Sequence, residues 1–156
     1  MIIRPYTPAD LEAVAQLFTA SVHQVAASHY DETQRTAWAP QPPKLNTWQE
    51  RLAPLQTLVA EENGRLAGFL SYEDDGHIDL LYTAPGSTRT GVASRLYHAA
   101  EAALAEAGAT ELFTEASLVA RPFFERQGFE VTEEQNVTRN NVNFRRFAMR
   151  KQLPPA

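Results

Sequence analysis

Two tight-turn signals in the middle of the chain constrain its fold more than any other feature. Asn63-Gly64 and Asp75-Gly76 are dipeptides that favour the turns of antiparallel β-hairpins. The segments beside them have the length and the β-branched and aromatic content of strands. The sequence therefore predicts an antiparallel meander of three strands, over residues 57–61, 65–73 and 77–83.

Helices are expected on both sides of this meander. Thr7, Pro8 and Asp10 are typical of a helix start, because threonine caps, proline suits the first turn and an acid suits the positive end of the helix. Caps, helical spacing and terminal glycines predict helices over residues 8–27, 31–38, 47–54, 91–107 and 119–127. Further strands are expected over residues 2–4, 111–116, 129–137 and 142–151, the last two joined by a hairpin at Asn140-Asn141.

This order of elements predicts an α/β or α+β fold with a mixed sheet and a crossover after residue 83. The 156 residues have the length of one domain, which we expect to span residues 1–156. A domain of this size buries roughly 70% of its unfolded surface, so it forms a core without covalent cross-links.

The composition excludes several kinds of site. The chain has no cysteine, which excludes disulfides, thiolate zinc sites and a cysteine nucleophile. Its four histidines lack metal-ligand spacing, so no metal is expected. No apolar run approaches a membrane span of about 20 residues, and no apolar stretch follows Arg4 as in a signal peptide. We therefore expect a cytoplasmic protein without a membrane partner.

The charge is unevenly distributed along the chain. The formal net charge is 14 − 19 = −5, but residues 136–151 carry five Lys and Arg and no acid, so the remainder nets −10. A basic segment can bind nucleic acid. Here its apolar residues follow a strand pattern with one change of phase, which favours a packed strand and predicts no nucleic-acid partner. These apolar residues are Val142, Phe144, Phe147 and Met149.

The segment from Leu81 to Ser94 joins a strand end to a helix start and is the strongest ligand-binding candidate. Unpaired amides at a helix N-terminus attract phosphate, and Gly91 and Ala93 let a ligand approach the backbone closely. A nucleotide P-loop is rejected, since Val92 and Ala93 stand where it needs Lys and Ser or Thr. A Rossmann glycine motif is absent. An ordinary helix start with two small residues remains the alternative.

The chain resembles the GNAT superfamily of N-acetyltransferases over nearly its whole length. Thr88–Ala93 is similar to the family's Gln/Arg-x-x-Gly-x-Gly/Ala pyrophosphate loop, except at Thr88. Other similar segments occur in the family's order: residues 3–10, Val59-Ala60-Glu61 with Gly64, 67–69, 78–85 and 120–129. The helical insert with Ser21-Val22-His23, Tyr30 and residues 37–40 resembles a bacterial subgroup of undefined substrate. The resemblance implies a mostly antiparallel sheet of about seven strands flanked by helices, splayed between the fourth and fifth.

The resemblance also implies that acetyl-CoA, as co-substrate, lies between the splayed strands. The backbone of the fourth strand would pair with the pantetheine arm, and the loop would hold the pyrophosphate. The implied contacts are Leu81, Tyr82, Thr83, Thr88, Arg89, Thr90, Gly91, Val92, Ala93, Ser94 and Phe124. The residues expected to contact the acceptor are His23, Tyr30, Trp38, His77 and Glu115.

The implied reaction is direct attack of a primary amine, of a small molecule or a peptide, on the thioester in a ternary complex. The amine must first lose a proton, and Asp79, His77 and Glu115 are the candidate bases, with Asp79 preferred. Strand alternation predicts one face shared by His77, Asp79, Leu81 and Thr83. The family's usual tyrosine acid is replaced by Phe124, so Ser117, Tyr82 or water would protonate the thiolate. A catalytically weak CoA-binding sensor or partner-binding module is the alternative, and the protein is expected to be a monomer or homodimer.

Overall fold

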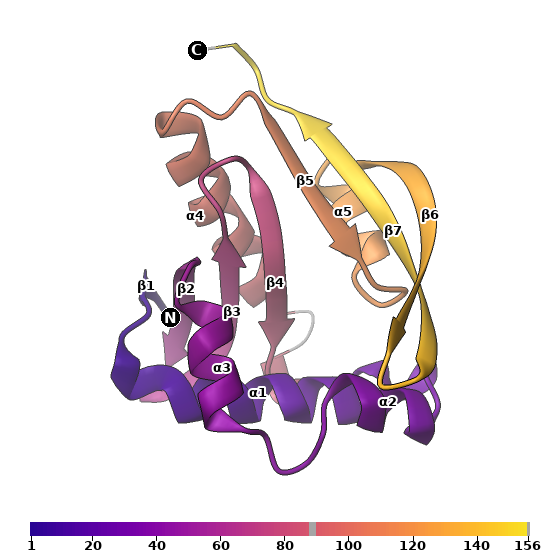
Figure 1. Cartoon of the computed structure of the whole chain (residues 1–156). Helices are drawn as coiled ribbons and strands as arrows, with labels where there is room; N and C mark the ends of the chain where they lie inside the picture. The colour runs from indigo at the N-terminus through magenta and orange to yellow at the C-terminus, as the bar shows by residue number, and fades with distance from the viewer. Residues whose placement is uncertain (88–89, 156) are drawn as a thin grey trace.

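The computed structural model describes residues 1–87 and 90–155, and Figure 1 shows a central sheet with helices on both faces. The sheet has seven strands in the order β1-β2-β3-β4-β5-β7-β6, and its neighbours are antiparallel except for the parallel pair β4–β5. The strands are β1 (Ile2–Pro5), β2 (Gln56–Glu62), β3 (Arg65–Tyr72), β4 (His77–Thr83), β5 (Glu111–Ala116), β6 (Glu130–Arg139) and β7 (Val142–Gln152). The helices are α1 (Leu11–Gln24), α2 (Glu32–Trp38), α3 (Leu45–Leu52), α4 (Val92–Glu106) and α5 (Arg121–Arg126). The predicted fold class is confirmed.

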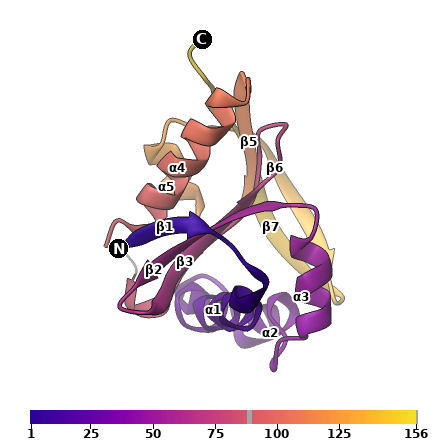
Figure 2. The same cartoon turned by 90° about the vertical axis from the view of Figure 1, so that its left-hand side faces the viewer.

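The helices divide between the two faces of the sheet (Figure 2). Phe18 of α1 and Trp48 of α3 pack edge to face at 4.7 Å between ring centroids and cover Phe69 of β3. Leu96 of α4 is fully buried on the opposite face, in a cluster that continues to Leu112 of β5. The apolar faces of the predicted helices therefore form the core on both sides of the sheet.

Strand β4 contains a bulge at Asp79, where its register with β3 shifts by one residue. A bulge inserts an extra residue and reverses the alternation of side chains beyond it. Ile78 and Leu81 accordingly pack in the cluster formed with α4, whereas Leu80 and Tyr82 pack in the cluster formed with α1. This corrects the prediction of a single face shared by His77, Asp79, Leu81 and Thr83.

Strands β4 and β5 pair at only two positions, at the beginning of β4 and in the middle of β5. His77 lies beside Phe113 and Ile78 beside Thr114, and the strands then diverge (Figure 1). The buried Thr114 hydroxyl donates to the Ile78 carbonyl at 2.8 Å and so stabilises the pairing of these two residues, the last pair before the strands diverge. Gly76 makes the close approach possible, since a Cβ there would lie 2.2 Å from the carbonyl oxygen of Glu111. The expected splay between the fourth and fifth strands is confirmed.

Several element boundaries differ from the prediction. The helix predicted from Pro8 begins as a 3₁₀ turn over Pro8–Asp10, and α1 itself begins at Leu11. Helix α1 ends at Gln24 and is followed by a separate 3₁₀ turn over Ala26–Ser28, and α5 begins at Arg121. The start predicted at Thr47 is wrong, since α3 begins at Leu45 after Lys44, which makes no capping bond with its side chain. The capping box of α2 is confirmed, with the Gln34 amide donating to the Asp31 carboxylate at 2.7 Å and the Asp31 amide donating to the Gln34 side chain at 3.0 Å.

Candidate active site

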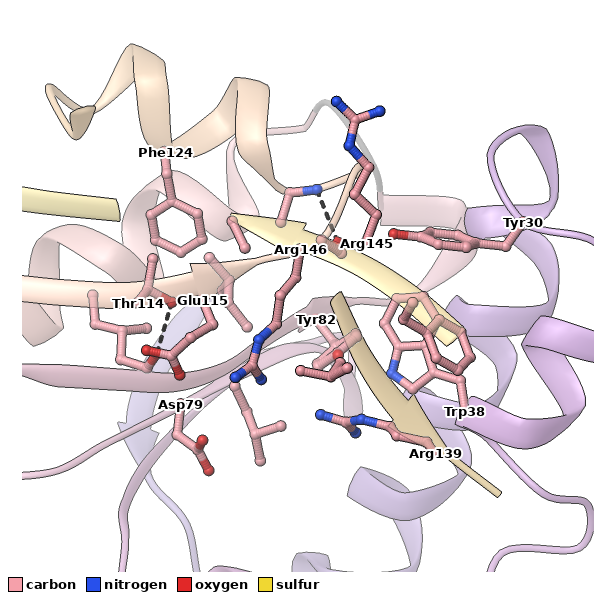
Figure 3. A pocket seen from close by; sticks show the side chains of 18 of the residues that line it. Tyr30, Trp38, Asp79, Tyr82, Thr114, Glu115, Phe124, Arg139, Arg145 and Arg146 are labelled. Atoms are coloured by element: carbon pink, nitrogen blue, oxygen red, sulfur yellow. Dashed lines mark hydrogen bonds between the residues drawn. The ribbon is translucent and has the colours of Figure 1, made fainter. Parts of the chain in front are cut away.

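The splay opens two cavities that meet between β4 and β5. The larger, of about 1250 Å³, lies among α1, the end of β4, the start of α4 and α5. The smaller, of about 120 Å³, lies where β4, β5, β6 and β7 face α2 and α3 (Figure 3). The two cavities share five lining residues: Trp38, Leu81, Tyr82, Ser117 and Ala120. A molecule in each cavity would therefore meet its neighbour at the splay.

The backbone of β4 faces the larger cavity with unused hydrogen-bonding groups. The Ala84 amide donates to the Ala67 carbonyl of the β3 side at 2.8 Å, so by antiparallel alternation the peptide groups of Leu81 and Thr83 point away from β3. Beyond Ile78 these groups have no partner strand among the residues that the structure describes. They form an exposed strand edge, which an extended molecule can join by β-augmentation.

The start of α4 lies at the mouth of the same cavity. Gly91, Val92, Ala93 and Ser94 line it, and the first amides of a helix lack intrahelical acceptors. Gly91 has a φ of +87°, and a Cβ there would meet nothing within 4 Å. The larger cavity therefore combines a strand edge with a helix N-terminus that is open to an anion.

Most of the predicted cofactor contacts line the larger cavity, with four exceptions. Thr88 and Arg89 lie outside the described residues. Thr90 is not among the described lining residues, and its hydroxyl donates to the Ser87 carbonyl at 2.5 Å. Phe124 is buried and lines the smaller cavity instead. Sequence reasoning missed the contribution of α5 and of the end of α1, which add Pro122, Phe123, Arg126, Val22 and Val25 to the wall.

Aromatic side chains form one wall of the smaller cavity. Tyr30 and Trp38 contact each other edge to face at 5.2 Å, and both contact Phe144 of β7. The Tyr30 hydroxyl accepts the Leu118 amide at 2.9 Å, and burial raises the pKa of Tyr30. Figure 3 shows Tyr30 and Trp38 at the same end of the cavity. The structure thus brings these two predicted acceptor contacts together, while Tyr30 also holds the chain after β5.

His77 and Glu115 form a bridge across the paired end of β4 and β5. The His77 ring lies between two carboxylates, with Nε2 2.8 Å from Glu115 and Nδ1 2.7 Å from Glu73, and it stacks on Phe113. The bond to Glu115, followed by that to Glu73, raises the pKa of His77 to about 9 despite opposing burial. Glu115 lines the smaller cavity, and its bond to His77 lowers its own pKa. At neutral pH His77 is therefore a charged imidazolium with both nitrogens occupied.

Asp79 and Glu115 are the two carboxylates among the described residues that line the smaller cavity. Figure 3 shows both at the end of the cavity opposite Trp38. Glu115 is engaged by His77, whereas no hydrogen bond or ion pair of Asp79 is found within the described chain. Asp79 is thus the carboxylate that remains available to a ligand.

Tyr82 and Ser117 stand where the cavities meet. Tyr82 stacks on Phe69 at 5.8 Å and contacts Phe18 edge to face, and burial raises its pKa to about 12. The Ser117 hydroxyl accepts the Ala120 amide at 3.1 Å, so its proton remains free to be donated. Among the described residues, these are the two side chains with a hydroxyl group that line both cavities.

His23 lines neither cavity within the described part of the chain. Its Nε2 lies 2.7 Å from the Ala39 carbonyl, so it joins α1 to the loop after α2. Its ligand contact stays a prediction without geometric support.

Four arginines line the smaller cavity and were not predicted as site residues. They come from α3, the end of β6 and the middle of β7, and they are Arg51, Arg139, Arg145 and Arg146. The basic run in residues 136–151 was the available signal, but strand pairing was needed to show which of its side chains face inward. Only the fold brings α3 next to this hairpin.

The comparisons with known proteins agree with this geometry. Residues 26–153 match the family described as the acetyltransferase (GNAT) domain. This chain is a member of the GNAT family. It is 36% identical over 148 residues to the uncharacterized N-acetyltransferase YafP of Escherichia coli K12, with 95% of this chain and 93% of YafP covered.

Solved structures extend the similarity. A GCN5-related N-acetyltransferase from Rhodopseudomonas palustris superposes with a TM-score of 0.93 at 33% identity, covering 97% of this chain and 95% of that one. The PaiA N-acetyltransferase from Thermoplasma acidophilum, solved with coenzyme A, superposes with a TM-score of 0.76 at 20% identity, covering 97% and 98%. At 20% identity, the similarity to the PaiA structure shows a shared fold and no more.

None of the helices in the described chain has the length and apolar character needed to cross a bilayer. Within residues 1–87 and 90–155, no three His, Asp or Glu side chains converge as a metal ion requires.

Proposed function

We propose that this protein transfers the acetyl group of acetyl-CoA to a primary amine by direct attack in a ternary complex. The observation that carries the proposal is the meeting of two cavities at Leu81, Tyr82 and Ser117, between the splayed strands. One cavity has the strand edge and helix N-terminus that suit pantetheine and pyrophosphate. The other is lined by the Asp79 carboxylate, which has no ion pair within the described chain, and suits the amine.

Coenzyme A would occupy the larger cavity. Its pantetheine amides would pair with the peptide groups of Leu81 and Thr83, and its pyrophosphate would accept the amides at the start of α4. Coenzyme A bound to the PaiA relative, which shares this fold, supports the choice of ligand. Of the two expected donors, Leu81 and Tyr82, only the Leu81 N–H points away from β3, and it would donate to the thioester carbonyl oxygen and stabilise the charge that develops there.

Asp79 would accept the proton that the acceptor ammonium must lose. The freed amine nitrogen then bonds to the acetyl carbon, the carbon–sulfur bond breaks, and the thiolate leaves with its electron pair. The nitrogen loses its second proton as the amide forms, and this proton neutralises the thiolate. His77 is a poor base because it is already protonated at neutral pH, as its pKa of about 9 requires. Glu115 is engaged by His77, which leaves Asp79 as the base that we propose.

Ser117 and Tyr82 remain the candidate donors to the thiolate. A Tyr82 pKa of about 12 lies well above a thiol pKa of about 8.5, so proton transfer from Tyr82 to a thiolate is uphill. Phe124 is buried against Phe129 and has no proton to give. A serine hydroxyl is a still weaker acid than Tyr82, so we propose that Ser117 stabilises the thiolate by donating a hydrogen bond to it and does not give up its proton.

Two measurements test the proposed function. Acetyl-CoA and CoA at about 100 times their Kd should stabilise the protein by about 2.7 kcal/mol, seen as a rise in Tm. Absence of a rise with either ligand would contradict CoA binding. Thiol release from acetyl-CoA with a panel of amines then separates an enzyme from a CoA-binding sensor, which would show the rise in Tm but no amine-dependent release.

A further inference from the structure

The smaller cavity is positively charged although the chain is negative overall. Four arginines and two carboxylates line it among the described residues, which gives 4 − 2 = +2. The whole chain carries −5. The negative charge of the chain, which favours a cationic ligand, therefore does not extend to this cavity.

Two of the four arginines are free to bind a ligand. Arg145 is paired with Glu134 at 2.5 Å, and Nε of Arg146 donates to the Gln135 side chain at 2.8 Å. Arg51 and Arg139 form no ion pair with any described residue, and the Arg51 guanidinium lies 5.6 Å from the centre of the Trp48 ring. These two guanidinium groups reach the cavity from opposite elements, α3 and the end of β6.

The surroundings of Arg139 favour an anionic partner. Figure 3 shows its guanidinium extending past Trp38 toward Tyr82. Burial, together with repulsion from Arg51 and Arg146, lowers the pKa of Arg139. Like charges disfavour one another, and a bound anion would offset both the repulsion between the arginines and the cost of burying Arg139.

The two signs of charge are separated within the cavity. Asp79 and Glu115 lie at one end, Arg139 lies at the other beside Trp38, and Arg146 stands between them (Figure 3). The acidic end suits an ammonium and the basic end a carboxylate, which arginine binds through two parallel N–H donors. The volume of about 120 Å³ is close to that of an engineered cavity that holds benzene, so the occupant is small.

We infer that the acceptor is a small amine that also carries a carboxylate, an amino acid in the simplest case. Its amine lies at Asp79, and its carboxylate is bound by Arg139 and Arg51. The aromatic wall of Tyr30 and Trp38 receives its apolar part. This inference rests on the proposed function, since it names the acceptor of the same reaction.

Matched pairs of an amino acid and its carboxamide test the inference in the chain of residues 1–156. Thiol release is measured with glycine, methionine and phenylalanine and with their carboxamides, which differ only in the anionic group. We expect kcat/KM to be at least about tenfold higher for the acid of the best pair, since a hydrogen bond to a charged group contributes at least one factor of ten. The amide amines are less basic, so reactivity alone favours the amides and cannot produce this result.

Variants assign the effect to the cavity. R139Q and R51Q should each lower kcat/KM for the acid about 10- to 100-fold, while kcat/KM for the amide stays within about twofold. R65Q is the matched control, because Arg65 is an exposed arginine at the start of β3 that lines neither cavity. It should leave both substrates unchanged.

A binding measurement separates this inference from the proposed function. Calorimetric titration with N-acetylmethionine and its amide, with CoA present, reports the carboxylate preference without turnover. A preference for the acid that R139Q abolishes supports the inference even if no amine releases thiol. Equal binding of the acid and its amide, binding of neither, or loss of binding of both in R139Q would overturn the inference. Failure of CoA to bind would instead overturn the proposed function.

Discussion

At the scale of single residues, the environment distinguishes side chains that the sequence left equivalent. Asp79, His77 and Glu115 were all predicted as bases from two strands. Their roles separate only because β4 and β5 pair at His77, which places its ring between Glu73 and Glu115. Sequence alone does not give the register between strands separated by a helix, so it predicts the set of residues without ranking them.

Removing the Asp79 carboxylate should slow the chemical step. We expect D79N to lower kcat about 10²- to 10⁴-fold, the usual range for loss of a general base, with the Kd of CoA unchanged. Asp74 is exposed in the preceding turn and lines neither cavity, so D74N is the matched control. Steady-state kinetics and a CoA titration check both variants. Retention of wild-type kcat by D79N would assign the base to another group.

The His77 bridge should make stability depend on pH. Its folded-state pKa of about 9 lies above the ordinary value of 6.5, so its stabilisation is fully present below pH 6.5 and is lost as the pH rises through 9. A shift of this size corresponds to about 1 to 3 kcal/mol. We expect the free energy of unfolding to fall over this range in the wild type.

H77Q should remove that part of the pH dependence. The exposed His98 of α4 provides the control, and H98Q should keep the wild-type slope. Denaturant titrations at pH 6, 7.5 and 9 give the three curves. An identical slope in H77Q and the wild type would show that the bridge does not stabilise the fold.

At the scale of elements, local signals predicted most of the fold and missed its irregularities. The turns at Asn63 and Asn140 were predictable because both need residues that tolerate positive φ, and both adopt it. The bulge at Asp79 has no comparable local signature in the sequence, since it depends on how β4 pairs with β3 on one side and with β5 on the other. The start of α3 at Leu45 was also missed, because packing of Trp48 and Leu52 fixes that helix where no side-chain cap does.

The N-terminus of α4 offers an element-scale test with an internal control. Gly91 and Gly108 flank the same helix, both have positive φ (+87° and +97°), and a Cβ at either would meet nothing within 4 Å. G91A and G108A should therefore lose similar stability, about 1 kcal/mol each. Only G91A should weaken CoA binding, by at least about tenfold, because its methyl group points into space that the pyrophosphate would occupy. Equal CoA affinity in the two variants, measured by calorimetry, would contradict the loop assignment.

At the scale of the whole molecule, the charge of the site comes from elements far apart in sequence. Arg51 lies on α3 and Arg139 on the β6–β7 hairpin, and Figure 1 shows these elements on either side of the splay. The basic run was correctly predicted to be strand, since β6 and β7 pair along most of their length. Phe144 and Phe147 are both buried because they face different clusters on opposite sides of β7, which explains the change of phase. A count of charges along the sequence therefore could not predict the positive charge of this cavity.

The two halves of the sheet should unfold together despite their short contact. Strands β4 and β5 pair at two positions, but the cluster around Leu96 of α4 includes Leu70 of β3 and Met149 of β7 and so spans both halves. Leu96 is fully buried, and L96A should cost about 2 to 5 kcal/mol through lost burial and the cavity left behind.

Fluorescence of Trp38 and Trp48 reports the α2–α3 side, while far-UV circular dichroism reports all elements. In L96A both signals should shift to the same lower denaturant midpoint, as expected for one domain over residues 1–156. Separate midpoints would show instead that the half-sheets fold independently and that the splay is a boundary between them.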